Sequence, residues 1–321
     1  MTVPASRSRG GVLGASLIVL AAIGFGTLGP VTRFADEAGV GSLTIVAWRA
    51  AIGATAMLIL LLALSRLAGR RAKSLGAVPR RERWFIGAAA IANLVLNLAM
   101  FIAFVRIEIG LSLLVFYGYP ALVAGASVLW FGDRLGALRW TALGVSVLGL
   151  ILTLGGSAGL GDLDGLGIGL SFLAAFAQAF YVLAARHGFA SIPPIEAAAT
   201  TMGLAAIGYV AIAVVTGQLA VLGQPLASTD ALVPVLAAAI VGAAIPTLAF
   251  ITGIRLLGAP RAAILATLEP VIGVALAAWL LGERPAPLQL VGGALILGAA
   301  ILLQVGPTGT VAEHEAVGAT G

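Results

Sequence analysis

Apolar runs of roughly 20 residues recur along the whole 321-residue chain, joined by short polar segments. A run of that length spans the hydrocarbon core of a bilayer, because a helix rises about 1.5 Å per residue. Lipid offers no hydrogen-bond partners, so such runs cross a membrane as helices. Only 10% of the residues are charged, against about a quarter in soluble domains. The sequence therefore predicts an all-α membrane protein.

Ten runs are long enough to be predicted as membrane spans. The first five are Val12–Phe34, Leu43–Leu64, Trp84–Val105, Gly110–Phe131 and Arg139–Leu154. The second five are Leu166–Ala185, Ile195–Thr216, Leu232–Gly253, Arg261–Leu281 and Pro287–Val305. Residues 307–321 are small and polar without periodicity, which predicts a disordered tail.

Basic residues are distributed unevenly among the loops. If the N-terminus is cytoplasmic, 14 Lys and Arg fall on the cytoplasmic side, and only Arg33, Arg106 and Arg284 fall on the other. This bias follows the positive-inside rule. The net charge of +5 is therefore interpreted as a topology signal rather than as a sign of nucleic-acid binding. An even number of spans then places both termini in the cytoplasm, as expected for a multi-pass protein of a bacterial-type inner membrane.

The two halves of the chain resemble each other. Residues 119–134 align without gaps on residues 269–284, an offset of 150. Five spans separate the copies, and because five is odd the copies enter the membrane from opposite faces. Inverted repeats of this kind are found mostly in secondary transporters, which alternate access around a central site. The predicted organisation is a first five-helix repeat over 1–157, a second over 158–306, and the tail.

Several motifs together resemble a known family. They are Glu269-Pro270 with Gly282-Glu283-Arg284, Tyr119-Pro120 with Gly132-Asp133-Arg134, the segment Ala22–Arg33, and Trp48-Arg49. The chain resembles the EamA-like branch of the drug/metabolite transporter superfamily, and within it the YddG-type amino-acid exporters. The resemblance implies export of amino acids across the inner membrane. Tyr119 stands where a symmetric site would carry a second acid. Ten helices enclose a site without a partner chain, so we expect a monomer in contact with lipid and a small-molecule substrate, without a cofactor.

Polar side chains at mid-membrane depth are costly and mark candidate sites. Tyr119 and Glu269 are repeat partners that approach the midplane from opposite faces, and Asn97 and Thr247 form a second such pair. The predicted substrate-binding residues are Trp48, Arg49, Asn97, Tyr119, Gln178, Tyr181, Thr247 and Glu269. The prolines after two of them, Pro120 and Pro270, remove helical hydrogen bonds and predict kinks that line a cavity.

Structural roles remain open for these residues. For Glu269 two interpretations have equal weight. In one it binds a substrate amine or carries a proton, and in the other it is a protonated or paired acid that fixes the kink. Arg49 has two alternatives to a substrate carboxylate: snorkelling to the headgroups or pairing with an acid. Each amide or hydroxyl alone also suits contact between helices, worth about 0.6 kcal/mol on average.

Other function classes find less support in the sequence. The chain has no cysteine, no Walker A sequence and no cluster of metal-ligand spacing. A dinucleotide-type glycine pattern at residues 24–29 lies inside an apolar run, and a nucleophile-elbow pattern at 155–159 has no credible triad partners. A carrier of drugs, sugars or nucleotides would share the same scaffold. A membrane enzyme acting on lipid-linked substrates and a passive channel are the remaining, weaker alternatives.

Overall fold

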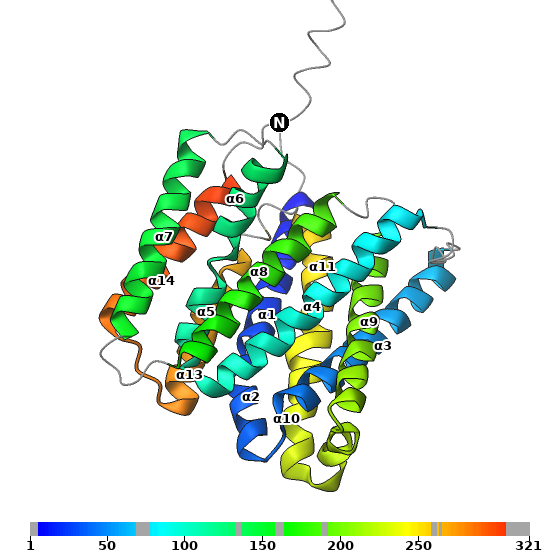
Figure 1. The fold of residues 1–321 in the computed structure, drawn as a ribbon. Helices are drawn as coiled ribbons and strands as arrows, with labels where there is room; N and C mark the ends of the chain where they lie inside the picture. Colours follow the sequence, from blue (N-terminus) through cyan, green and yellow to red (C-terminus); the bar gives the residue numbers. More distant parts are fainter. Residues whose placement is uncertain are drawn as a thin grey trace, which may run out of the picture.

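The computed structural model of the chain describes residues 6–68, 78–131, 136–157, 164–187, 192–257, 262 and 265–305. These residues form helices and connecting turns, without strands. Within them, seven helical stretches are long and apolar enough to cross a membrane, and three shorter apolar helices accompany them. Seven and three make ten, so the predicted all-α membrane fold with ten crossings is confirmed (Figure 1).

The elements of the first half are α1 (Ser6–Gly26), α2 (Leu28–Glu37), α3 (Ser42–Ala68), α4 (Arg80–Arg106), α5 (Ile109–Phe116), α6 (Tyr119–Phe131) and α7 (Ala137–Ser157). The elements of the second half are α8 (Gly165–His187), α9 (Pro194–Val215), η2 (Leu219–Ala227), α10 (Thr229–Ala239), η3 (Ile240–Ala244), α11 (Ile245–Leu257), α13 (Leu268–Leu281) and α14 (Pro287–Val305).

Several predicted spans are interrupted along their length. The first breaks at Thr27 into α1 and α2, and the fourth breaks at residues 117–118 into α5 and α6. A proline lies in the first turn after each break, Pro30 in α2 and Pro120 in α6, where its missing N–H is tolerated. The eighth span passes through the short π-helix η3, which ends just before Pro246. The ninth predicted span is helical at residues 265–266, turns at Thr267 and continues as α13 from Leu268, and its predicted start at Arg261 lies outside the described residues.

The helices form two walls that face each other. The α1 wall consists of α1, α11 and α13, and the α4 wall consists of α3, α4, α8 and α9. Within the walls α1 packs on α11 and α13, while α4 packs on α8 and α9. A third layer, α7 against α14, lies beside them on α5 and α6. The two walls therefore frame the interior of the molecule.

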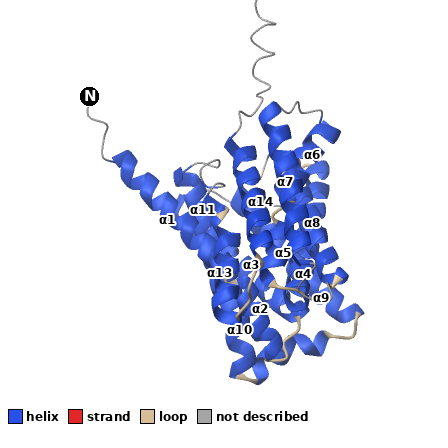
Figure 2. Cartoon of the chain, turned by 90° about the vertical axis from the view of Figure 1, so that its left-hand side faces the viewer, coloured by secondary structure: helices blue, strands red, loops and turns tan. Residues whose placement is uncertain are grey.

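The two ends of the molecule differ. We call the end where α1 begins and α14 ends the terminal face, and the opposite end, where α13 ends, the Glu283 face (Figure 1). Toward the terminal face α1 and α11 lean away from α8 and α4, whereas α2 and α10 lie together at the Glu283 face (Figure 2). At that end α2 packs on α4, α10 and α13, and α5 packs on α13.

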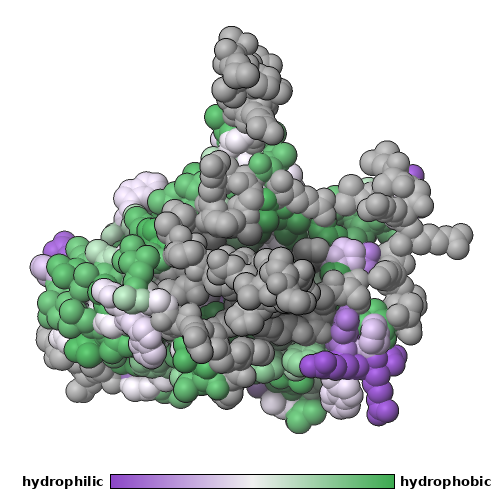
Figure 3. Space-filling view, turned by 90° about the horizontal axis from the view of Figure 1, so that it is seen from above, coloured by the Kyte–Doolittle hydropathy of each residue, from purple (hydrophilic) through white to green (hydrophobic). Residues whose placement is uncertain are grey.

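The outer surface of the helices is apolar. Large side chains such as Leu129, Trp279 and Val215 are about four-fifths exposed, at 80%, 79% and 87%. Hydrophobic residues are also widespread on the described surface seen from the terminal face, where the most hydrophilic residues cluster at the lower right of the view and a smaller group lies at the left (Figure 3). Such a surface is suited to contact with lipid tails rather than with water.

Candidate functional site

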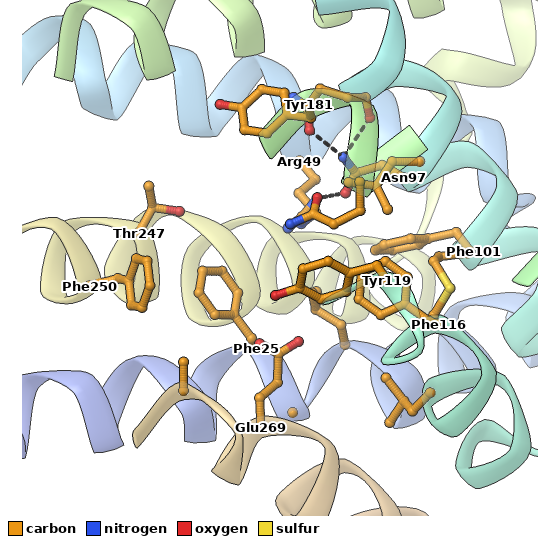
Figure 4. Close-up of a pocket in the computed structure, with 18 of the residues that line it drawn as sticks. Phe25, Arg49, Asn97, Phe101, Phe116, Tyr119, Tyr181, Thr247, Phe250 and Glu269 are labelled. Atoms are coloured by element: carbon orange, nitrogen blue, oxygen red, sulfur yellow. Dashed lines mark hydrogen bonds between the residues drawn. The ribbon is translucent and has the colours of Figure 1, made fainter. Parts of the chain in front are cut away.

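A cavity of about 400 Å³ lies between the two walls, with α5 and α6 at its side. Its apolar lining includes Phe25, Phe101 and Phe250 (Figure 4). The polar and charged side chains in the lining are Arg49, Asn93, Asn97, Tyr117, Tyr119, Gln178, Tyr181, Thr201, Tyr209, Thr247, Thr267 and Glu269. The volume falls within the range of about 300–1,000 Å³ that is usual for small-molecule sites.

Seven of the eight residues predicted for substrate binding line this one cavity, together with Pro120. Both repeat-related pairs are among them, so positions separated by 150 residues meet in the interior. Trp48 is the exception: it is outside the lining, and its indole Nε1 donates to the carbonyl oxygen of Leu222 at 2.8 Å. The hydroxyl of Thr44 donates to the carbonyl oxygen of Val221 at 3.4 Å. These two hydrogen bonds join α3 to η2.

Arg49 projects from α3 into the cavity (Figure 4). One guanidinium nitrogen, Nη1, donates to Oδ1 of Asn97. The amide nitrogen of Asn97 in turn donates to the backbone oxygen and to Oδ1 of Asn93, at 2.7 and 2.8 Å, which turns the amide oxygen toward Arg49. The guanidinium carbon also lies 5.6 Å from the ring centre of Phe101. The guanidinium group is thus held inside the cavity.

Part of the Arg49 guanidinium is left without a partner. Among the described residues, its Nε is a buried donor with no hydrogen bond. A buried donor without an acceptor costs about 1–3 kcal/mol, more when it is charged. An acceptor that enters the cavity would remove this cost.

Glu269 approaches from the opposite wall, in the first turn of α13. Its carboxyl group interacts with the hydroxyl of Tyr117, which lies at the break between α5 and α6. Arg49 and Glu269 influence each other electrostatically, but no ion pair joins them. The cavity therefore has a positive group on one wall and an acidic group on the other.

Three aromatic rings surround the space beside Glu269. The ring centres of Phe116, Tyr117 and Tyr119 lie 5.4 to 5.9 Å from one another. The Tyr119 hydroxyl interacts with the side chain of Gln178 on α8. In Figure 4 Tyr119 lies between Arg49 and Glu269. The rings thus form an apolar surface that connects the two charged groups.

Sequence reasoning did not find several residues of the lining. Phe25, Thr201, Tyr209 and Phe250 face the cavity but were not predicted to bind substrate. Tyr209 donates its hydroxyl to the carbonyl oxygen of Leu94 at 3.0 Å, which joins α9 to α4. A tyrosine in the middle of an apolar span is a signal that could have found it. The phenylalanines carry no such signal.

These observations define a polytopic membrane protein with an internal cavity of the size that small-molecule sites have. The chain belongs to the EamA-like transporter family, whose model matches residues 12–155 and 165–305. Members of that family are transporters rather than enzymes, so the chain is a membrane transporter of small molecules.

Two further comparisons concern other proteins. A solved structure described only as the crystal structure of a protein is similar, with a TM-score of 0.58 and 20% sequence identity. The similarity covers 93% of this chain and 99% of the other, and at this identity it supports the fold alone. No protein with a curated description matches the sequence.

Proposed function

We propose that the protein is a secondary transporter that exports amino acids across the inner membrane by alternating access. The observation that carries the proposal is the placement of Arg49 and Glu269 on opposite walls of one cavity without an ion pair between them. An α-amino acid has one charge of each sign a short distance apart. It therefore satisfies both groups at once.

The carboxylate of the substrate would bind near Arg49. The unpartnered Nε is a ready donor, and the guanidinium favours planar, paired contacts with carboxylates. Asn97 holds the guanidinium in position through its own contact with Asn93. Such preorganisation lowers the entropic cost of binding.

The ammonium group of the substrate would bind near Glu269. The carboxyl group provides the countercharge, and the faces of Tyr117 and Tyr119 add attraction for a cation. Gln178 and Thr247 add hydrogen-bonding groups to the lining, whereas Tyr181 lies on the side of Arg49 (Figure 4). An ammonium is strongly hydrated, so it needs such replacements when it leaves water.

The remaining lining is apolar and suits a side chain. Phe25, Phe104 and Phe250 lie among the lining residues, with Met100 and Leu96. Apolar walls discriminate by only about 1–3 kcal/mol per methylene. Several neutral amino acids are therefore expected to share the site.

Alternating access is supported by the arrangement of the walls. The repeats enter the membrane from opposite faces, and the walls meet at the Glu283 face but lean apart toward the terminal face (Figure 2). The excess of Lys and Arg in the loops at the terminal face supports a cytoplasmic position for that face. The cavity would then receive substrate from the cytoplasm, which suits export.

A substrate panel in proteoliposomes tests the proposal. Liposomes that contain the purified protein are preloaded with unlabelled neutral amino acids, and exchange of a labelled amino acid is measured with and without a proton gradient. Protein-free liposomes are the control. We expect exchange that several neutral amino acids inhibit by competition, and overexpressing cells that tolerate toxic amino-acid analogues. Movement of a cationic drug, a sugar or a nucleoside without any amino-acid flux would contradict the assignment of cargo.

A further inference from the structure

The short junction between α4 and α5, residues 107–110, is held by two charged side chains. Arg33, on α2, donates from Nη2 to the carbonyl oxygen of Ile107 at 2.7 Å. Glu283, just beyond α13, accepts the backbone N–H of Ile109 at 2.9 Å and that of Gly110 at 3.2 Å. Three backbone groups of the junction thus bind two side chains, and every contact is charge-assisted.

Both side chains come from the side of the α1 wall. Arg33 lies on α2, which continues α1 after the break at Thr27, and Glu283 follows directly after α13. The junction itself ends α4, which belongs to the other wall. The contacts therefore tie one wall of the cavity to the other at the Glu283 face. Gly282 allows this geometry, because its φ of 71° lies in the left-handed region and directs the chain away from α13.

Other features at this junction agree with a closing contact. Ile107 and Ile109 are buried, at 8% and 0% exposure, and Arg33 and Glu283 are half-buried, so the contacts are partly shielded from water. The charges of Arg33 and Glu283 also lie close enough to interact with each other. At the terminal face, in contrast, α1 and α11 do not pack extensively on α4, α8 or α9 within the described residues.

The sequence does not repeat this arrangement in the second half. Glu283 corresponds to Asp133 at the offset of 150 residues, but Gly110 corresponds to Pro260. Proline has no backbone N–H, so one of the two donors that Glu283 uses has no counterpart there. Gene duplication alone therefore does not account for the contact.

We propose that Arg33 and Glu283 clamp the α4–α5 junction and hold the cavity closed toward the Glu283 face. Release of substrate to that face then requires both side chains to break their hydrogen bonds with the junction. The clamp rests on the proposed alternating access and adds the step that limits opening. It binds backbone atoms, so substrate selectivity does not depend on it.

Accessibility of a single cysteine tests the clamp without a transport assay. The chain contains no cysteine, so Ala50→Cys introduces a unique thiol in the cavity lining on α3. A membrane-impermeant maleimide is then applied to sealed vesicles from either face. With the clamp intact, labelling is fast from the terminal face and slow from the Glu283 face.

Removing the clamp should change only the rate of labelling from the Glu283 face. In Glu283→Ala, labelling from the Glu283 face should rise about tenfold, which corresponds to about 1.4 kcal/mol. Labelling from the terminal face should not rise. Arg33→Met should act in the same direction. Glu37→Gln, at an exposed acid on the end of α2, is the matched control and should have no effect.

Two results would overturn the clamp. One is an unchanged labelling rate from the Glu283 face in both variants. The other is a rise from both faces, which would indicate loosened packing. Failure of the transport proposal can be told apart from failure of the clamp. If amino-acid flux is absent but labelling rises from the Glu283 face alone, the proposed cargo is refuted and the clamp stands. Normal flux with unchanged labelling refutes the clamp and leaves the transport proposal.

Discussion

Arg49 and Glu269 lie on opposite sides of the central cavity, close enough to influence each other and without a salt bridge between them. Direct pairing would neutralise both groups and fill the space between the walls. Instead Arg49 binds the neutral amide oxygen of Asn97, and the hydroxyl of Tyr117 faces Glu269. Unpaired charges inside a membrane protein are costly and are kept where they serve function. This separation is the observation on which the proposed zwitterionic substrate rests.

Asp164 provides a prediction about pH. Its Oδ1 accepts the backbone N–H groups of Leu166 and Gly167 at the start of α8, and its Oδ2 pairs with Nε of Arg106 at 2.7 Å. The hydrogen bond from Gly167, followed by the contact with Arg106, lowers the pKa of Asp164 below its ordinary value of 3.8. A lowered pKa in the folded state means that the carboxylate stabilises the protein above pH 3.8, and that this contribution disappears as the pH falls through the lowered value.

Asp164→Asn should therefore lower the melting temperature of the detergent-solubilised protein at pH 5 to 7, and the difference should vanish in stronger acid. Asparagine still caps a helix, so the change isolates the charge. Asp36→Asn, at an exposed position of α2, is the control. A difference that persists unchanged at low pH would contradict this account.

Gly292 provides a prediction about packing. A Cβ atom at this position would lie 2.5 Å from the backbone oxygen of Gly149 and 2.6 Å from the backbone nitrogen of Thr153, so α14 and α7 would have to separate. Overpacking of this kind costs about 1–3 kcal/mol. Gly292→Ala should lower the melting temperature. Gly298→Ala, on the same helix with nothing within 4 Å of the added Cβ, should not. Equal melting temperatures for the two variants would refute the close packing.

The charge bias of the loops provides a prediction about topology. Reporter fusions after Arg80 and at Gly321 should report the cytoplasm, and a fusion after Asp162 should report the outside. The segment from Arg66 to Arg83 carries seven of the basic residues, so neutralising them should disturb insertion more than any other loop change. A reporter after Arg80 that indicates the outside would reverse the orientation and with it the direction of export.

Repeat symmetry explains how much of the cavity could be predicted from the sequence. Residues at an offset of 150 occupy equivalent depths in inverted repeats, so Asn97 and Thr247 meet Tyr119 and Glu269 in one cavity. Symmetry gives no information about Arg49, Gln178 and Tyr181, which have no repeat partner of like chemistry and were predicted from their polarity within apolar spans. Tyr209 carries the same signal but was not predicted.

Helix geometry explains why Trp48 lies outside the cavity. Trp48 and Arg49 are neighbours in sequence, but adjacent residues on a helix point in different directions. Arg49 faces the cavity while Trp48 binds η2. The break at Thr27 and the π-helix η3 also escaped prediction, because apolar composition reports a span but not the continuity of its hydrogen bonds.

The most direct test of the account compares a neutral amino acid with two analogues, one without the carboxylate and one without the ammonium, in proteoliposome exchange. The wild type should prefer the zwitterion over both analogues by about tenfold to hundredfold, since a hydrogen bond to a charged group contributes about 1.5–3 kcal/mol. Arg49→Met should lose the preference for the carboxylate, and Glu269→Gln the preference for the ammonium. Arg66→Met, at an exposed position on the same helix as Arg49, should keep both. Full exchange and unchanged preferences in the Arg49 and Glu269 variants would contradict the account and leave both charges a purely structural role.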